Sequence, residues 1–461
     1  MKRLPLLLTA LALAWTGGAR AQSATLGAYI DEALRANPAL QAQAAATRAS
    51  AEAAAAARAQ QLPSLALNAR YTRAEGGRTI DFPAGDLLNG VYATLNRFLE
   101  ERGEPAVFPQ IENQSIALLR EKEQETKLSL TAPLYAPQLW ARADAQVALH
   151  GASLAEREAY ARVLVREVKR AYYGAVQAEA AERILAASEA LLAEDVRVSQ
   201  ALVDAGKATR DRVLRAQAER LDVVQRQDEA AVLAAQARRR LNILRDQPAD
   251  AALVLPPPES LERPPPLPLV GPDRPELRQL DRTIAAADAG RRAAGGALLP
   301  TLALAADYGV QGTDYELSRD DDFATVSLVL NWSLWDFGAR SAQKRQAIAD
   351  AERLRAQRVD LGRQLDLAHW TAAEQLGTAL RAIDAAQARL AAAEEVFRIA
   401  ERKRAAAALS QVEFLDAERA LTEARLNLAI ARCTALDRAA ELELASASYP
   451  LPARLLALAK V

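Results

Sequence analysis

The sequence predicts a mostly helical chain made of two tandem repeats, each contributing two membrane-type β-strands and a long antiparallel coiled-coil hairpin. Three observations predict this fold class. Matching phrases occur in two distant parts of the chain, and four segments of about ten residues alternate apolar and polar side chains. Two very long runs also lack proline and repeat apolar residues every seven positions.

Composition favours helix and excludes several classes of protein. The chain has 461 residues, of which 51% are hydrophobic but only 5% aromatic, because alanine supplies much of the apolar fraction. Lys and Arg number 58 against 59 Asp and Glu, so no basic field points to nucleic acid as a partner. The single cysteine, Cys433, excludes an internal disulfide.

The first 21 residues are predicted to be a secretory signal peptide. Lys2 and Arg3 precede the apolar stretch 4–15, which is too short to span a bilayer as a helix, and Ala19-Arg20-Ala21 fits a cleavage site. No cysteine stands at the cleavage site, so we expect an exported chain without a lipid anchor. The remaining sequence contains no apolar run long enough for a transmembrane helix.

The repeat is visible in two pairs of phrases. "LPSLALNARY" (62–71) returns as "LPTLALAADY" (299–308), 237 positions later. "LSLTAPLY" (128–135) returns as "LVLNWSLW" (328–335), 200 positions later, so the first half carries 37 extra residues between its two phrases. The chain is therefore an internal duplication whose first half has a longer loop at 73–126.

A proline-rich stretch, "LPPPESLERPPPLPLV", separates the two halves and excludes helix there. We expect five segments along the chain. They are a signal peptide at 1–21, a first repeat at 22–254, a linker at 255–272, a second repeat at 273–445 and a tail at 446–461.

Each repeat is expected to run from a helix through two strands into two long helices. The first helices, 25–59 and 273–296, stop at Leu-Pro pairs. The expected strands are 62–72, 127–135, 300–310 and 324–335. The expected long helices are 138–203, 207–245, 338–403 and 410–442.

Alternation in the four strands allows two interpretations. Leu65, Leu67 and Tyr71 fall on one face of the first strand, with Asn68 and Arg70 on the other. A membrane-barrel strand shows this pattern, but so does a half-buried strand of a soluble sheet. Aromatic residues near the strand ends favour the membrane, since they resemble an interfacial belt. They are Tyr135, Trp140, Trp332, Trp335 and Phe337.

The long helices have the period of coiled coils, and the strands imply association. Ile184, Leu191 and Val198 are seven apart, and the series from Leu376 through Ile383 and Leu390 to Phe397 keeps this spacing. Four strands cannot close a barrel, and open sheet edges do not occur in lipid. Copies of the chain must therefore pool strands, and the residues alone do not choose between a dimer with eight and a trimer with twelve.

These features together resemble the TolC-like outer-membrane efflux protein family. The resemblance rests on the exported duplicated halves, the "LPxLxL" joints, the "PLY" and "SLWDFGAR" joints and the "FLDAE" segment, and it covers nearly the whole mature chain. It implies a trimer with a 12-strand β-barrel in the outer membrane, continued by a 12-helix α-barrel across the periplasm. It also implies an exit duct that works with a periplasmic adaptor and an inner-membrane transporter in efflux or type I secretion.

The resemblance also implies roles for the turns of the two long hairpins, which would be the periplasmic tips that contact the adaptor. The tip residues are Gly206, Lys207, Ala208, Thr209, Leu409 and Ser410. The second tip has Ala407 where the family usually has glycine. Glu413 and Asp416 match an acidic pair that constricts the channel, and Arg212 and Arg215 stand at the equivalent places of the first repeat as possible ties.

Other classes of function fit less well. The only histidines, His150 and His369, lie in predicted long helices, and we find no phosphate-binding loop, metal-spaced cluster or nucleophile arrangement. We therefore expect no enzyme activity and no cofactor. A periplasmic adaptor would lack the duplication, and a purely structural coiled coil would leave the strands unexplained. The sequence does not exclude a pore that works independently of any pump, and it does not identify the cargo. The role of the 73–126 loop is also not predicted, although 86–101 could form a short helix.

Overall fold

The computed structural model describes residues 26–265, 274–313, 321–406 and 408–456. The predicted signal peptide, the end of the linker and Ala407 therefore lie outside the described residues. The chain divides into two compact units, which are considered separately. One unit contains Asp144–Asp288, Ala347–Val461 and the chain up to Ala54, and the other contains Ala55–Ala143 and Ala289–Gln346.

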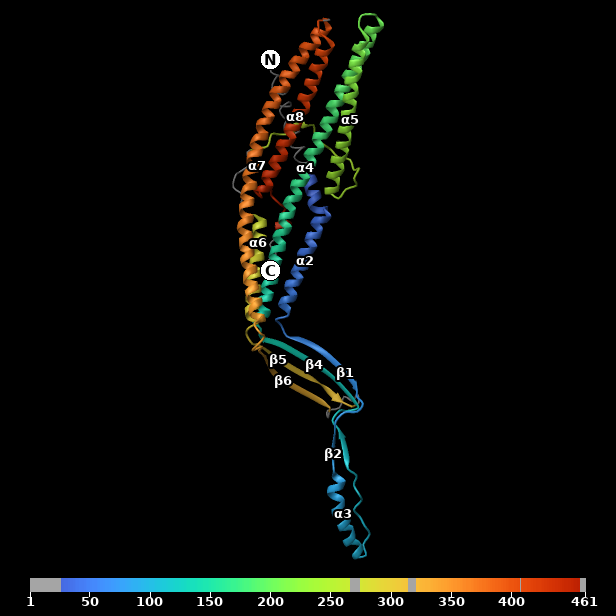
Figure 1. The fold of residues 1–461 in the computed structure, drawn as a ribbon, viewed down its shortest axis with the longest axis vertical. Helices are drawn as coiled ribbons and strands as arrows, with labels where there is room; N and C mark the ends of the chain where they lie inside the picture. Colours follow the sequence, from blue (N-terminus) through green and yellow to red (C-terminus); the bar gives the residue numbers. More distant parts are fainter. Residues whose placement is uncertain (1–25, 266–273, 314–320, 407, 457–461) are drawn as a thin grey trace, which may run out of the picture. The chain divides into compact units, whose positions relative to one another are not determined.

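Helices dominate the chain, and their order follows the predicted repeat (Figure 1). The helices α2, α4 and α5 of the first half correspond to α6, α7 and α8 of the second. Their bounds are α2 Pro38–Ala59, α4 Pro137–Asp204, α5 Arg210–Leu244, α6 Pro275–Gly296, α7 Ala339–Ala405, α8 Gln411–Ala445 and the short α9 Ala453–Leu456. No helix in the described part of the chain is both long and apolar enough to cross a membrane.

Local signals in the sequence set several helix ends. Asn37 interrupts the helical run that begins at residue 26, and its side-chain oxygen accepts hydrogen bonds from the backbone N–H groups of Ala39 and Leu40. Pro38 follows as the first residue of α2, a position where its missing N–H costs nothing. α5 begins at Arg210, later than predicted, because Thr209 is extended (φ −90°, ψ 155°).

The four long strands form one antiparallel sheet in the order β1-β4-β5-β6. Their bounds are β1 Ser64–Arg73, β4 Lys122–Tyr135, β5 Thr301–Gly312 and β6 Asp322–Asn331. The pairing of β4 with β5 joins the two repeats in one sheet. Gly309 is required in this pairing, because a Cβ atom there would lie 2.4 Å from the carbonyl oxygen of Thr126.

Two strand bounds differ from the sequence-based expectation by four residues or more, and the others differ by two at most. β4 starts at Lys122, five residues earlier than predicted, because its charged start pairs with the polar end of β1 as far as Arg73. β6 ends at Asn331, four residues earlier than predicted, because β5 begins with Thr301 directly opposite. Trp332 and Trp335 therefore follow the strand and are not part of it.

The 73–126 loop contains structure of its own. It folds into the short strands β2 (Thr79–Phe82) and β3 (Gln114–Ala117), which pair with each other, and the helix α3 (Ala84–Glu101) between them. α3 covers the segment 86–101, for which the sequence suggested a short helix.

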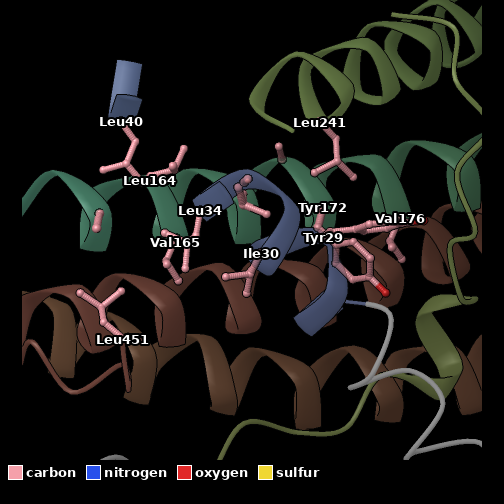
Figure 2. Packing of buried hydrophobic residues seen from close by; sticks show 14 of the residues in the cluster. Tyr29, Ile30, Leu34, Leu40, Leu164, Val165, Tyr172, Val176, Leu241 and Leu451 are labelled. Carbon is pink, nitrogen blue, oxygen red and sulfur yellow. The ribbon is translucent and has the colours of Figure 1, made fainter. Parts of the chain in front are cut away.

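The main core of the helical unit lies around the middle of α4 (Figure 2). Ile30 and Leu34, from the first helical run, pack against Val165 and its neighbours on α4. Tyr29 stacks edge-on with Tyr172, with ring centroids 6.2 Å apart. The core also takes side chains from α5, α8, the linker and the tail, among them Leu241, Cys433, Leu261 and Leu451.

Candidate functional site

One face of the sheet is apolar and open to the surroundings. Directly opposed residues share a face, and the row Leu65, Leu130, Ala306 and Val326 runs across all four strands. Leu67 is 69% exposed and Leu328 is 64% exposed. A soluble half-buried sheet would cover this face, so the exposure favours the membrane interpretation of the alternation.

The opposite face of the same sheet is polar. Asn68 donates a hydrogen bond to Ser129 at 3.0 Å. Arg70 lies 3.3 Å from Glu125, and Lys127 lies 2.8 Å from the same carboxylate. The outer edges of β1 and β6 pair with no other strand in the described part of the chain. Such edges are templates for pairing with another copy.

The five predicted belt aromatics are all exposed and lie near one end of the four long strands. Tyr135 and Trp140 stack edge-on with ring centroids 5.9 Å apart, and Trp335 and Phe337 do the same at 5.9 Å. The indole N–H of Trp332 donates to the carbonyl of Leu298 at 3.3 Å. Exposed aromatic pairs with satisfied polar ends suit a water–lipid interface.

The first hairpin turn, between α4 and α5, closes through two backbone hydrogen bonds. Lys207 N–H donates to the Leu202 carbonyl at 2.8 Å, and Gly206 N–H donates to the Val203 carbonyl at 2.9 Å. This is the Schellman pattern, and Gly206 has the positive φ of 71° that it requires. Ala208 and Thr209 continue the turn, and the Thr209 hydroxyl donates to Asp211.

The second hairpin turn begins α8 with a capping box. The Ser410 hydroxyl accepts from the Glu413 backbone N–H at 3.2 Å, and the Glu413 carboxylate accepts from the Ser410 N–H at 3.0 Å. The hydrogen bonds from Ser410 lower the pKa of Glu413 below its usual value. Ala408 N–H donates to the Lys403 carbonyl at 2.8 Å, the equivalent of the bond made by Lys207. Leu409 packs against the hydrophobic cluster at this end of the helices.

The structure brings together only some of the charged residues that were predicted at the two hairpin turns. Arg215 and Asp416 line one cleft of about 590 Å³ between α5 and α8, but the nearest recorded partner of Arg215 is Asp211, at 3.8 Å. Asp416 lies 3.8 Å from Arg419, and Arg212 donates to the Ser199 hydroxyl at 3.3 Å. Within the described residues of one chain, neither arginine pairs with Glu413 or Asp416.

The structure adds a buried polar network that sequence reasoning missed. Leu185 and Leu192 are buried, and three positions after each of them α4 holds a buried polar residue, Ser188 and Asp195 respectively. Asp195, 1% exposed, accepts hydrogen bonds from Arg404 at the end of α7 and Gln411 at the start of α8. Ser188 donates to Glu418 on α8 at 2.5 Å.

The network ties the first hairpin to the second, and Arg419 adds a further bond to Glu219 at 2.5 Å. The available signal was a pair of polar residues seven positions apart, Ser188 and Asp195, each three positions after a leucine of the heptad series. Its partners could not be found from sequence, because they lie more than 200 positions away.

Both histidines and the single cysteine are buried. His150 is buried and its Nδ1 lies 3.0 Å from the Ser50 hydroxyl. His369 is also buried. Burial raises the pKa of the Cys433 thiol to about 12. The described residues contain no group of three or more His, Cys, Asp or Glu placed to hold a metal ion.

Comparisons with known proteins agree with this geometry. Residues 272–448 match the family model of the outer membrane efflux protein. No curated protein matched the sequence.

Several solved structures similar to this chain are outer-membrane channels. The open state of the Neisseria gonorrhoeae MtrE outer membrane channel is 20% identical with a TM-score of 0.75, covering 92% of this chain and 88% of that one. The Campylobacter jejuni CmeC outer membrane channel is 14% identical with a TM-score of 0.77, covering 92% and 85%. The outer-membrane channel OprN is 19% identical with a TM-score of 0.76, covering 92% and 89%.

The similarity extends over both repeats, whereas the family model covers the second repeat and a few flanking residues. It confirms the resemblance that the duplicated phrases suggested. Residues 272–448 therefore match the outer membrane efflux protein family, and the chain has the fold of outer-membrane channels.

Proposed function

We propose that this protein is the outer-membrane exit duct of a tripartite efflux or type I secretion system. The observation that carries the proposal is the four-stranded sheet, which has one exposed apolar face, one polar face and two open edges. Lipid would cover the apolar face, and the polar face would line a water-filled lumen. The protein has a transport role and no enzyme activity under this proposal.

Three copies would close the barrel. β1 of one copy would pair with β6 of the next, so that no edge remains exposed to lipid. Three sheets of four strands give the twelve strands that the family resemblance implies. The chain would reach the outer membrane by means of its predicted signal peptide, without a lipid anchor, and its helices would extend into the periplasm.

The hairpin turns would contact a periplasmic adaptor, which would connect the duct to an inner-membrane transporter. The Schellman turn at Gly206 and the capping box at Ser410 support this assignment, because they hold both turns in defined conformations that a partner can recognise. Lys207, Ala208, Thr209 and Leu409 would provide the remaining contacts.

Native mass tests the proposed duct. The mature protein is extracted with a mild detergent from purified outer membranes, and its mass is compared with that of a single chain of 49.7 kDa before signal removal. A trimer in the outer-membrane fraction is expected, since the sheet edges need partners. A monomer in the soluble periplasmic fraction would contradict the proposal.

Glu413 and Asp416 are proposed to form an acidic constriction inside the second turn. Three copies would place six carboxylates around one opening and favour cations there. The double variant Glu413→Gln and Asp416→Asn removes this charge, and glutamine can still close the capping box with Ser410. Cation selectivity in planar bilayers should fall, whereas Glu394→Gln, on an exposed part of α7, should leave it unchanged.

Equal selectivity and conductance in the double variant and in the parent would remove the constriction from the proposal. Separately, the proposed ties from Arg212 and Arg215 to the carboxylates of the second turn would cross between copies, because each arginine has other neighbours within its own chain. Arg215→Gln should raise the open probability of the channel if such a tie holds the resting state.

A further inference from the structure

Helix α3 presents a row of exposed apolar side chains at coiled-coil spacing. Leu88, Val91, Leu95 and Phe98 follow one another at steps of three, four and three, and we call this row the α3 seam. Val91 is 54% exposed and Phe98 is 59% exposed. Leu87 lies beside the seam and is 63% exposed. Such a row at the surface indicates a surface that packs against a partner.

The chain's own contacts hold another side of α3, so the seam cannot turn inward. The Asn89 side chain donates to the Ile111 carbonyl and accepts from the Ile111 N–H, both at 2.8 Å. Asn96 makes the same pair of bonds with the backbone of Phe108, at 2.7 and 3.0 Å. Four hydrogen bonds therefore fix the rotation of the helix about its axis.

A close backbone approach at Gly85 also holds α3 in this orientation. A Cβ atom at this position would lie 2.4 Å from the Ile111 carbonyl oxygen, so the start of α3 lies directly against the segment that Asn89 binds. The Tyr92 and Phe108 rings add a contact, with centroids 5.3 Å apart.

The charges on α3 favour a second copy of the chain as the occupant of the seam. With Leu88 at heptad position a, Asp86 and Glu100 fall at f and Arg97 at c, away from a partner helix. Glu101 falls at a flanking g position, but the e position that would face it in a neighbouring copy lies beyond the end of α3. Between parallel helices in register, the flanking g and e positions would pair Leu87 with Tyr92, which brings no like charges together.

A membrane surface is a poorer match for α3. Helices that lie on membranes carry mostly Lys and Arg on their polar face. The polar face of α3 has Arg97 as its single basic residue, against the acidic residues Asp86, Glu100 and Glu101.

We propose that the α3 seam packs against the α3 helices of neighbouring copies, forming a short parallel coiled coil. This inference rests on the proposed trimer. Four side chains on an 18-residue helix are too few for a free-standing interface, which buries about 800 Å² per partner. Sheet pairing between copies would raise the effective concentration of α3 and allow the seam to close.

Cysteine cross-linking tests the inference in the full-length protein. Val91→Cys places a thiol in the seam, and Ala93→Cys places one at the exposed f position as a matched control. The parent protein is the background, because its single cysteine, Cys433, is buried. Outer membranes are treated with a short bismaleimide, free thiols are blocked, and cross-linked chains are separated on denaturing gels. Native mass is measured for each variant.

Val91→Cys should give a cross-linked pair of chains at least tenfold faster than Ala93→Cys. One thiol per chain links only two of three copies, so a dimer band is expected even from a trimer. Equal rates, or no cross-link, in a protein of trimeric mass would overturn the seam and leave the duct proposal standing. A monomeric mass would instead overturn the duct proposal.

Two other results would assign the seam to a different occupant and overturn the inference. One is a cross-link from Val91→Cys to a different protein. The other is quenching by brominated lipids of a fluorophore attached at this position, which would place the seam against the bilayer.

Discussion

At the scale of single residues, different residues stabilise the described parts of the two hairpin turns. Gly206 supplies the positive φ in the first turn, and Ser410 with Glu413 satisfies the free N–H groups at the start of α8 in the second. Sequence reasoning assigned Ser410 to adaptor contact and Glu413 to a constriction. The structure adds a folding role for both, because their side chains bond each other's backbone N–H groups.

Ser410→Ala should loosen the first turn of α8. Loss of an N-cap costs about 1 kcal/mol, so the protection of the Glu413 amide against hydrogen exchange should fall roughly fivefold at pH 7. Ser410→Thr keeps a capping hydroxyl and should stay close to the parent. Unchanged protection in Ser410→Ala would show that the capping box does not stabilise the turn.

The capping box should also depend on pH. Hydrogen bonds from Ser410 lower the pKa of Glu413, so its stabilising effect is fully present above the ordinary carboxylate pKa of 4.5. The effect is lost as the pH falls through the lowered pKa of the folded state. The difference in protection between the parent and Ser410→Ala should therefore shrink at pH 3.

At the scale of elements, the long helices depend on heptad positions that are not all apolar. Leu376, Ile383 and Phe397 of α7 are buried, as their spacing predicted. On α4, Leu185 and Leu192 are also buried seven positions apart, whereas the burial of Asp195 depends on its hydrogen bonds with Arg404 and Gln411.

Two glycines of the first hairpin should respond to alanine in opposite directions. Gly206 has φ +71°, and an added Cβ would meet no atom within 4 Å, so Gly206→Ala should cost about 1 kcal/mol through backbone strain alone. Gly174 lies inside α4 with equally open space, so Gly174→Ala should stabilise the helix by about 0.5–1 kcal/mol. Hydrogen exchange of the flanking amides measures both, and a loss of protection at Gly174 would contradict this view.

At the scale of the whole molecule, the sheet faces decide where the protein can reside. Leu67 and Asn68 are neighbours on opposite faces of β1. Leu67→Lys should cost about 2–4 kcal/mol if that face meets the bilayer interior, and should reduce the trimer recovered from outer membranes. Asn68→Lys, on the proposed lumen face, should assemble normally. Equal recovery of the two variants would mean that lipid does not distinguish the faces.

The sequence by itself determined the order of elements, because local signals control them. The Leu-Pro joints end α2 and α6, period-two alternation marks the strands, and heptads mark the long helices. The duplication also led to the family resemblance, which the match of residues 272–448 to the family model bears out.

Only the tertiary structure decided which residues meet. β4 extends back to Lys122 because β1 pairs with it, and β6 stops at Asn331 because β5 begins opposite. The partners of Asp195 and Ser188 were hidden for a related reason. Periodicity indicates which face a residue occupies within its own helix or strand. Hydrogen bonds between elements depend instead on how distant segments are brought together, and packing across the whole chain sets this arrangement.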